Sequence, residues 1–263
     1  METSVLSRDG APRTAHRWRR REHPLPPQAA RVAADLRRDG IARTSVAELT
    51  GQDGLLQDVL DCAGALLAHR GAAVAAHRRR LAARQRPWGP APEAERVALL
   101  GPDVPAGACR RLLAEPVLSA VVEASSHRAV RQVQVEAWLE VASPSPVPPR
   151  RWQRESAGRH PLVEVWVNLT GDEDGQGPLH YVRGTHRRGR RGGAGTFEAP
   201  GGPVGTVVLA DLRGMHRRSP AVGRDRLLLR ALLSGRRPAR ARPPVLSAEL
   251  RLPSDAGYAL AGA

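Results

Sequence analysis

Four residues in the second half of the chain have the types and the spacing that a small-molecule site needs. Gln153 and Glu155 stand two apart in the segment RRWQRESAG, and two positions apart on an extended segment put both side chains on one side. His216 ends the segment ADLRGMH, and Arg226 opens a run of leucines ten residues later. Imidazole and carboxylate groups bind metals, and a buried arginine can hold a carboxylate through paired hydrogen bonds.

The first half of the chain is predicted to be helical. Residues 26–39 carry an apolar stripe that includes Val32 and Leu36, and Gly40 is expected to end this helix. Residues 54–85 predict a second helix that Gly71 divides. A third helix is predicted over residues 107–126, with an interruption at Pro116. A short extended piece is expected from Ile41.

Beyond residue 127 the pattern changes to strands. Residues 129–141 alternate between an apolar face and a mostly polar one, which predicts a half-buried strand. The apolar face holds Val133, Val135, Ala137 and Leu139, and the other holds Gln132, Gln134, Glu136 and Trp138. Further strands are predicted in 161–170, 178–184, 205–212 and 225–234. Helices followed by short strands indicate an α+β chain with a β-barrel or sandwich, and the candidate residues lie at the ends of its strands, where small-molecule sites collect.

The segments VWVNLTGDEDGQGPLHYVRGTHR and GTVVLADLRGMHRRSPAVGRDRLLL carry a resemblance to a known family. From about Arg31 to Ser234, and most specifically over 133–230, the chain resembles the phytanoyl-CoA dioxygenase-like family of Fe(II)- and 2-oxoglutarate-dependent oxygenases. The resemblance implies a double-stranded β-helix, a jelly-roll or cupin-like barrel, with the N-terminal helices packed on it. It also implies Fe(II) and 2-oxoglutarate as cofactors and a small organic substrate.

Position by position, the resemblance assigns Glu155 and His216 as metal ligands and Arg226 as the 2-oxoglutarate arginine. Arg224 and Arg230 match that last position less well. Gln153 stands where the family has its first histidine ligand. A glutamine offers a metal only its neutral carbonyl oxygen, which suits hard cations better than Fe(II), so the metal site is expected to be degenerate.

Two functions follow from this reading. The first is a hydroxylase of a small organic substrate with weakened metal affinity. The second is a non-catalytic family member that acts as a small-molecule-binding or accessory module. An arginine-rich site rim would favour acidic or carrier-bound molecules.

The formal charge of +15 suggests a third function, nucleic-acid binding, which other features of the sequence disfavour. The chain contains no lysine, and Ile41 is its only isoleucine, so a bias toward GC-rich codons accounts for much of the arginine. Aromatic residues make up 3 %, too few for base-stacking platforms.

The organisation predicted along the chain is simple. Residues 1–27 are predicted to form a flexible basic arm. Residues 28–263 are predicted to form one domain, with a helical part at about 28–127, a barrel part at about 128–235 and a C-terminal tail at about 236–263.

No apolar run reaches the length of a membrane span, and the N-terminal residues have no apolar signal region. Cys62 and Cys109 form no close-spaced metal or redox motif, so the expected location is the reducing cytoplasm. The oligomeric state is not indicated.

Overall fold

The computed structural model describes residues 24–84, 96–100, 107–142, 151–155, 160–171, 179–187, 197–198 and 201–235. Residues 1–23 of the predicted arm and the predicted tail at 236–263 lie outside the described residues.

The helices lie where the sequence predicts them. They are α1 (Pro27–Asp39), α3 (Leu55–His69), α4 (Gly71–Arg84), α5 (Gly107–Leu113) and α6 (Pro116–Ser126). Gly40 ends α1 in the left-handed conformation, with φ of 80°, and its N–H donates to the carbonyl of Leu36. The predicted break at Gly71 is a bend of 67° between α3 and α4. In the described residues, no one helix has both the length and the apolarity to cross a membrane. The bent pair α3–α4 passes that test only when taken together, by length and composition.

The sequence analysis missed one short helix, α2 (Val46–Thr50). It begins with a capping box: the Ser45 hydroxyl accepts from the N–H of Glu48, while the Glu48 carboxylate accepts from the N–H of Ser45. A helix this short has too few turns to show an apolar stripe, so only the cap could have revealed it.

Six strands form the main sheet, in the order β1-β7-β4-β9-β3-β2, with every neighbouring pair antiparallel. Their bounds are β1 (Ile41–Ser45), β2 (Arg96–Ala98), β3 (Arg131–Glu140), β4 (Leu162–Asn168), β7 (Thr206–Asp211) and β9 (Arg226–Ser234). Of the two edge strands, β1 is the short extended piece expected from Ile41, whereas β2 was not predicted. β2 is only three residues long, which is too short for an alternating pattern to be visible in the sequence.

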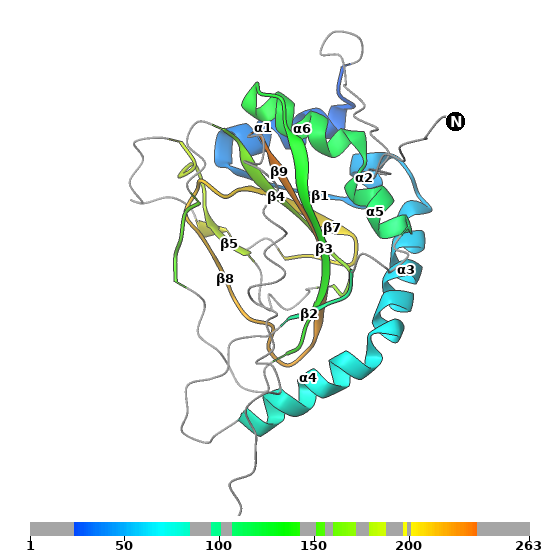
Figure 1. Ribbon diagram of the computed structural model, residues 1–263. Coiled ribbons are helices and arrows are strands. Elements are labelled where there is room, and N and C mark those ends of the chain that lie inside the picture. The colour runs from blue at the N-terminus through cyan, green and yellow to red at the C-terminus, as the bar shows by residue number, and fades with distance from the viewer. Residues whose placement is uncertain are drawn as a thin grey trace, which may run out of the picture.

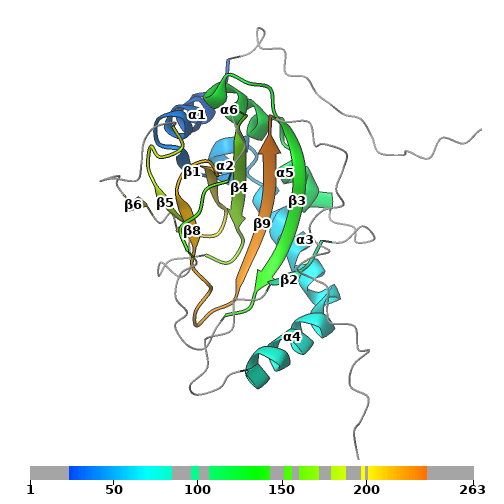
Figure 2. The same ribbon diagram turned by 60° about the vertical axis from the view of Figure 1, so that its left-hand side comes forward.

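The outer face of the main sheet is covered by helices (Figures 1 and 2). Val165, Leu209 and Leu229, from the three central strands, are fully buried there and join one apolar cluster with Val32 of α1 and Leu66 of α3. This cluster is the larger of the two apolar cores, and we call it the outer core.

The inner face of the main sheet packs against a small sheet of β5 (Leu179–Val182), β6 (Phe197–Glu198) and β8 (His216–Arg218), in the order β6-β5-β8. Trp138 and Trp166 of the main sheet share a cluster with Tyr181 of the small one. In the described residues the strands form two separate facing sheets, so the sheet is not closed and the predicted jelly-roll or cupin-like barrel is not confirmed as a barrel.

Candidate functional site

Gln153 and His216 lie directly opposite one another at the edge of the small sheet. The N–H of Gln153 donates to the carbonyl of His216 at 2.8 Å, and the N–H of His216 donates back at 3.0 Å. Directly opposed residues of an antiparallel pair place their side chains on the same face. The amide Nε2 of Gln153 accordingly lies 3.3 Å from Nε2 of His216. The structure therefore brings together the first and the last of the predicted metal-ligand positions.

The hydrogen bonds of His216 define how its ring is protonated. Its Nδ1 lies 3.0 Å from the carbonyl oxygen of Gly214, which can only accept, so Nδ1 carries the proton. The other ring nitrogen, Nε2, faces the side-chain amide of Gln153 at 3.3 Å. The ring is 3 % exposed. The nitrogen that a metal would use therefore faces an amide where the family pattern has a second imidazole.

Glu155 follows on the same segment, and its N–H donates to the carbonyl of Leu212 at 2.8 Å. Its side chain, like that of Gln153, is exposed. Among the residues that the structure describes, no group of three or more His, Cys, Asp and Glu side chains could hold a metal ion. An Fe(II) site of the 2-His-1-carboxylate type requires two imidazoles with free lone pairs. One engaged imidazole, one amide and one exposed carboxylate do not fit that requirement.

Arg226, the predicted 2-oxoglutarate ligand, is buried on the inner face and binds a carboxylate of the chain itself. Its Nε donates to Oε2 of Glu140 at 3.0 Å, and its Nη2 donates to the same oxygen. Nη2 also lies 3.4 Å from the carbonyl of Ser219. Glu140 stands directly opposite Arg226 in the β3–β9 ladder, so the pair is set by strand register.

The carboxyl group of Glu140 is charged at neutral pH, so it forms an ion pair with Arg226. Burial would raise the pKa of this carboxyl, but the guanidinium groups of Arg226 and Arg96 outweigh burial and hold the pKa below its usual range. Arg96 also forms an ion pair with Glu140 at 3.2 Å. The carboxylate of Glu140 therefore occupies the guanidinium group that a dicarboxylate such as 2-oxoglutarate would need.

The alternative candidates occupy different environments. Arg224 is exposed, whereas Arg230 points to the inner face and donates to Glu136 at 2.7 Å. Outside these candidates, the ring of His186 lies 3.2 Å from the carbonyl of Arg37, and this contact ties the turn after β5 to the end of α1.

Sequence reasoning missed the most deeply buried charge of the inner face, Glu164 on β4, which is 2 % exposed. Its carboxylate accepts from Arg218 at 3.2 Å, from Nε of Arg230, and from the indole N–H of Trp166 at 3.0 Å. Burial raises the pKa of Glu164, but Arg218 and Arg230 outweigh it and the net pKa is lowered. The available signal was a lone carboxylate in the apolar run LVEVWVN together with a lone arginine in LLLRALL. Buried charges need partners, so these two could have been paired.

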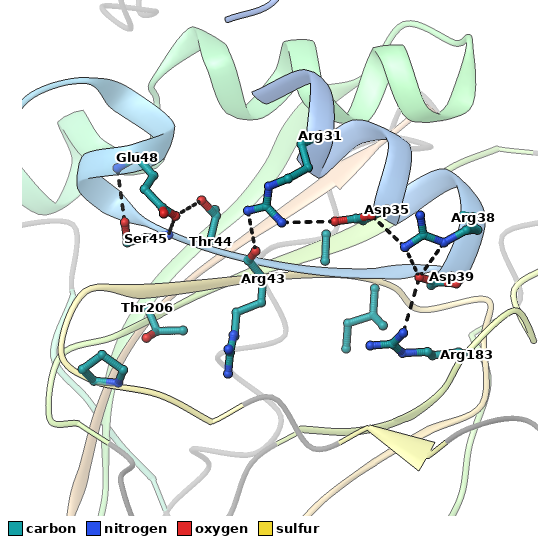
Figure 3. Close-up of a pocket in the computed structure, with 13 residues that line it drawn as sticks. Arg31, Asp35, Arg38, Asp39, Arg43, Thr44, Ser45, Glu48, Arg183 and Thr206 are labelled. Atoms are coloured by element: carbon teal, nitrogen blue, oxygen red, sulfur yellow. Dashed lines mark hydrogen bonds and ion pairs between the residues drawn. The ribbon is translucent and has the colours of Figure 1, made fainter. Parts of the chain in front are cut away.

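A second candidate site is a pocket of about 430 Å³ beside the edge strand β1, which Figure 3 shows from the side of α1. Its charged side chains pair mostly with one another. Asp35 pairs with Arg31 at 3.3 Å and with Arg38 at 2.7 Å, and Asp39 pairs with Arg38 at 2.8 Å and with Arg183 at 3.7 Å. These ion pairs satisfy charges of both signs within the pocket wall, so the pocket defines no class of charged ligand.

Comparison with known proteins places the fold. No protein-family model matches the sequence, and no curated protein matches it closely enough to count as a relative. Solved structures do match in fold, and they include a non-heme α-ketoglutarate-dependent epimerase and a protein solved with bound Fe.

Three structures illustrate the match. The α-ketoglutarate-dependent epimerase SnoN from nogalamycin biosynthesis is 21 % identical with a TM-score of 0.51, over 78 % of this chain and 81 % of SnoN. AviO1 from Streptomyces viridochromogenes Tue57 is 19 % identical with a TM-score of 0.54, over 83 % of this chain and 98 % of AviO1. EctD from S. alaskensis, solved with bound Fe, is 19 % identical with a TM-score of 0.54, over 78 % of this chain and 76 % of EctD. At these identities the likeness describes the fold alone.

Proposed function

We propose that this chain is a phytanoyl-CoA dioxygenase-like protein that no longer hydroxylates and instead works as a small-molecule-binding or accessory module. The observation that carries the proposal is the contact between Gln153 and His216, which sets an amide beside His216 where the family pattern has a second imidazole. The Arg226–Glu140 pair supports it independently, because it fills the position assigned to 2-oxoglutarate with a carboxylate of the chain.

The two contacts concern different cofactors, the metal and 2-oxoglutarate, so each supports the proposal independently of the other. A glutamine in place of a histidine removes one nitrogen donor, and losing even a partner of a ligand typically lowers metal affinity roughly 10–100-fold. Glu140 is charged and held by two arginines, so a free dicarboxylate has to displace it before Arg226 can bind.

The second candidate function is the hydroxylase, which would use Fe(II) and 2-oxoglutarate on a small organic substrate. The observation that favours it is the placement of Gln153 opposite His216 with Glu155 two residues further along. A glutamine that turned its carbonyl oxygen inward would complete a set of one nitrogen and two oxygen donors.

A metal titration separates the two functions. Under anaerobic conditions, wild-type protein with Fe(II) and 2-oxoglutarate should show no visible charge-transfer band, and it should release no succinate under air. Gln153→His should bind Co(II), a stable substitute for Fe(II), at least roughly tenfold more tightly than wild type, because it supplies the second imidazole. Adding Glu140→Gln to this variant should allow 2-oxoglutarate to reach Arg226.

A matched control places the new histidine elsewhere. Gln57→His adds an imidazole on the exposed side of α3, where Gln57 bonds only Asp61 at 2.8 Å, and it should leave Co(II) affinity unchanged. A charge-transfer band and succinate release from the wild-type protein would overturn the binding-module proposal in favour of the hydroxylase.

A further inference from the structure

Two cysteines meet where α3 and α5 pack together, on the helical side of the outer core (Figure 1). Cys62 lies on α3 and Cys109 on α5, and both are free thiols. The Sγ of Cys109 lies 3.8 Å from the carbonyl oxygen of Val59, which is three residues before Cys62. Residues three apart share a face of a helix, so the Cys109 thiol lies against the face of α3 that carries Cys62.

Other contacts fix the two helices at this place. An ion pair at 2.6 Å joins Asp58 of α3 to Arg111 of α5. Asp58 lies about one turn before Cys62, and Arg111 follows Cys109 by two residues. Val59 is 0 % exposed and belongs to the same apolar cluster as Cys109. The ion pair and the apolar contact therefore hold the two thiols in one defined arrangement.

The two thiols also interact directly. Burial raises the pKa of the Cys109 thiol to about 12, and a hydrogen bond with Cys62 adds to this rise. Cys109 therefore keeps its proton at neutral pH, and a protonated thiol reacts slowly with oxidants. A hydrogen bond between two thiols brings their sulfur atoms close, which is the first requirement of a disulfide.

The two cysteines differ in their access to solvent. Cys109 is 0 % exposed, whereas Cys62 is partly exposed, so an oxidant from solvent reaches Cys62 first. The chain contains 2 cysteines, and the fold brings both to one contact although they lie far apart in the sequence. An accessible cysteine next to a second one that can condense with it is typical of redox-responsive pairs.

We propose that Cys62 and Cys109 form a reversible disulfide that links α3 to α5 when hydrogen peroxide oxidises Cys62. The Cys62 sulfur attacks one oxygen of the peroxide, the O–O bond breaks, and the products are the sulfenic acid of Cys62 and water. The Cys109 sulfur then attacks the Cys62 sulfur, the S–O bond breaks, and the hydroxide leaves with the proton of Cys109 as a second water. The peroxide gains the two electrons that the two sulfurs lose. An external thiol reverses the bond by exchange.

The bond acts on the outer core and is independent of any ligand of the inner face. It closes a loop that contains α4 and β2. A cross-link stabilises the folded chain mainly because it restricts the unfolded one. In a reducing compartment such bonds are transient and respond to oxidants.

The test is oxidation of the full chain with hydrogen peroxide, followed by denaturation in N-ethylmaleimide and measurement of the intact mass. Oxidised wild type should be two hydrogens lighter than the reduced chain, should carry no maleimide and should remain a single chain on a non-reducing gel. Dithiothreitol should return both thiols to labelling. Because the chain contains 2 cysteines, the mass alone identifies the bond.

Three outcomes would overturn the proposal. They are maleimide on both thiols after oxidation, added oxygen on Cys62 beside a labelled Cys109, and a covalent dimer. The urea midpoint of the oxidised form should rise, because the loop is closed. A fall in that midpoint would mean that the bond requires another arrangement of α3 and α5, and it would overturn the native contact as its origin.

Two variants, each checked for folding by circular dichroism, make the test specific. Cys109→Ser leaves Cys62 without a second thiol, so dimedone, a reagent for sulfenic acids, should label it at least roughly tenfold more than wild type. The matched control combines Cys62→Ser with Gln57→Cys, which moves the accessible thiol roughly 140° around α3 to an exposed position. The new cysteine should be oxidised without bonding to Cys109. A disulfide in this control would refute the specific pair, and if Cys109→Ser does not fold, the control and the wild-type mass still decide.

Discussion

The two faces of the main sheet are built on opposite principles. The outer face buries mainly apolar side chains from the strands against the helices, as Val165, Leu209 and Leu229 show. The inner face buries Trp138 and Trp166 beside charged groups such as Glu140 and Glu164. One sheet thus separates a largely apolar core from a face that buries ion pairs.

The difference between the outer and inner faces shows that the two depend on different kinds of interaction. Apolar burial is non-directional and contributes roughly 25 cal/mol per Å², so the outer core needs only the right volume and pattern. Buried ion pairs add little net stability, because desolvation consumes most of the attraction between the charges. The ion pairs of the inner face therefore contribute mainly through their geometry, because removing one partner leaves the other charge buried without a counterion.

The largest effect is expected from breaking the inner cluster at its most buried carboxylate. Glu164→Gln keeps the shape of the side chain but leaves Arg218 and Arg230 without their shared counterion, which should destabilise the fold by about 3–5 kcal/mol. Urea unfolding followed by circular dichroism measures this change. Asp58→Asn is the control: it breaks an exposed pair with Arg111 and should change stability little.

A smaller loss is expected from the outer core. Leu209→Ala removes a fully buried side chain from the central strand β7 and should cost about 3 kcal/mol through lost burial and the cavity left behind. The same unfolding measurement applies. A loss larger than that of Glu164→Gln would mean that the outer core, not the inner ion pairs, is the more sensitive part of the fold.

The contrast between the faces also explains which features the sequence alone predicts. Alternation placed Ala137 and Leu139 opposite Trp138 on β3, and the structure confirms this division. The pairing of Gln153 with His216 depends on a ladder between segments far apart in the chain, and only the motif, not periodicity, placed them together.

What the sequence could not reveal is the set of partners on the inner face. The partner of Arg226 is decided by the register of β3 against β9, which sets Glu140 opposite it, and the β-bulge between Gln132 and Gln134 shifts that register. The predicted jelly-roll or cupin-like barrel is supported as a mixed helix and antiparallel-sheet fold, but the described strands form two separate sheets, so the barrel itself is not confirmed.

The smallest effect is a change in the pH dependence of stability, and it distinguishes the two faces most directly. The arginines around Glu164 hold its pKa in the folded protein below the ordinary value, despite burial. A lowered pKa contributes stability that is complete above the unfolded value and is lost as pH falls through the folded one, so the loss runs from about pH 5 downward. The difference in stability between wild type and Glu164→Gln should therefore narrow as the pH falls from 7 toward about 3, measured by comparing urea midpoints.

Leu209→Ala is the control, because it retains every titrating group, including His180 and His186, whose pKa values burial lowers. Its curve of stability against pH should run parallel to that of wild type. A gap for Glu164→Gln that stays constant over the same range would mean that folding leaves the pKa of Glu164 unchanged, so the surrounding arginines would not stabilise its charge.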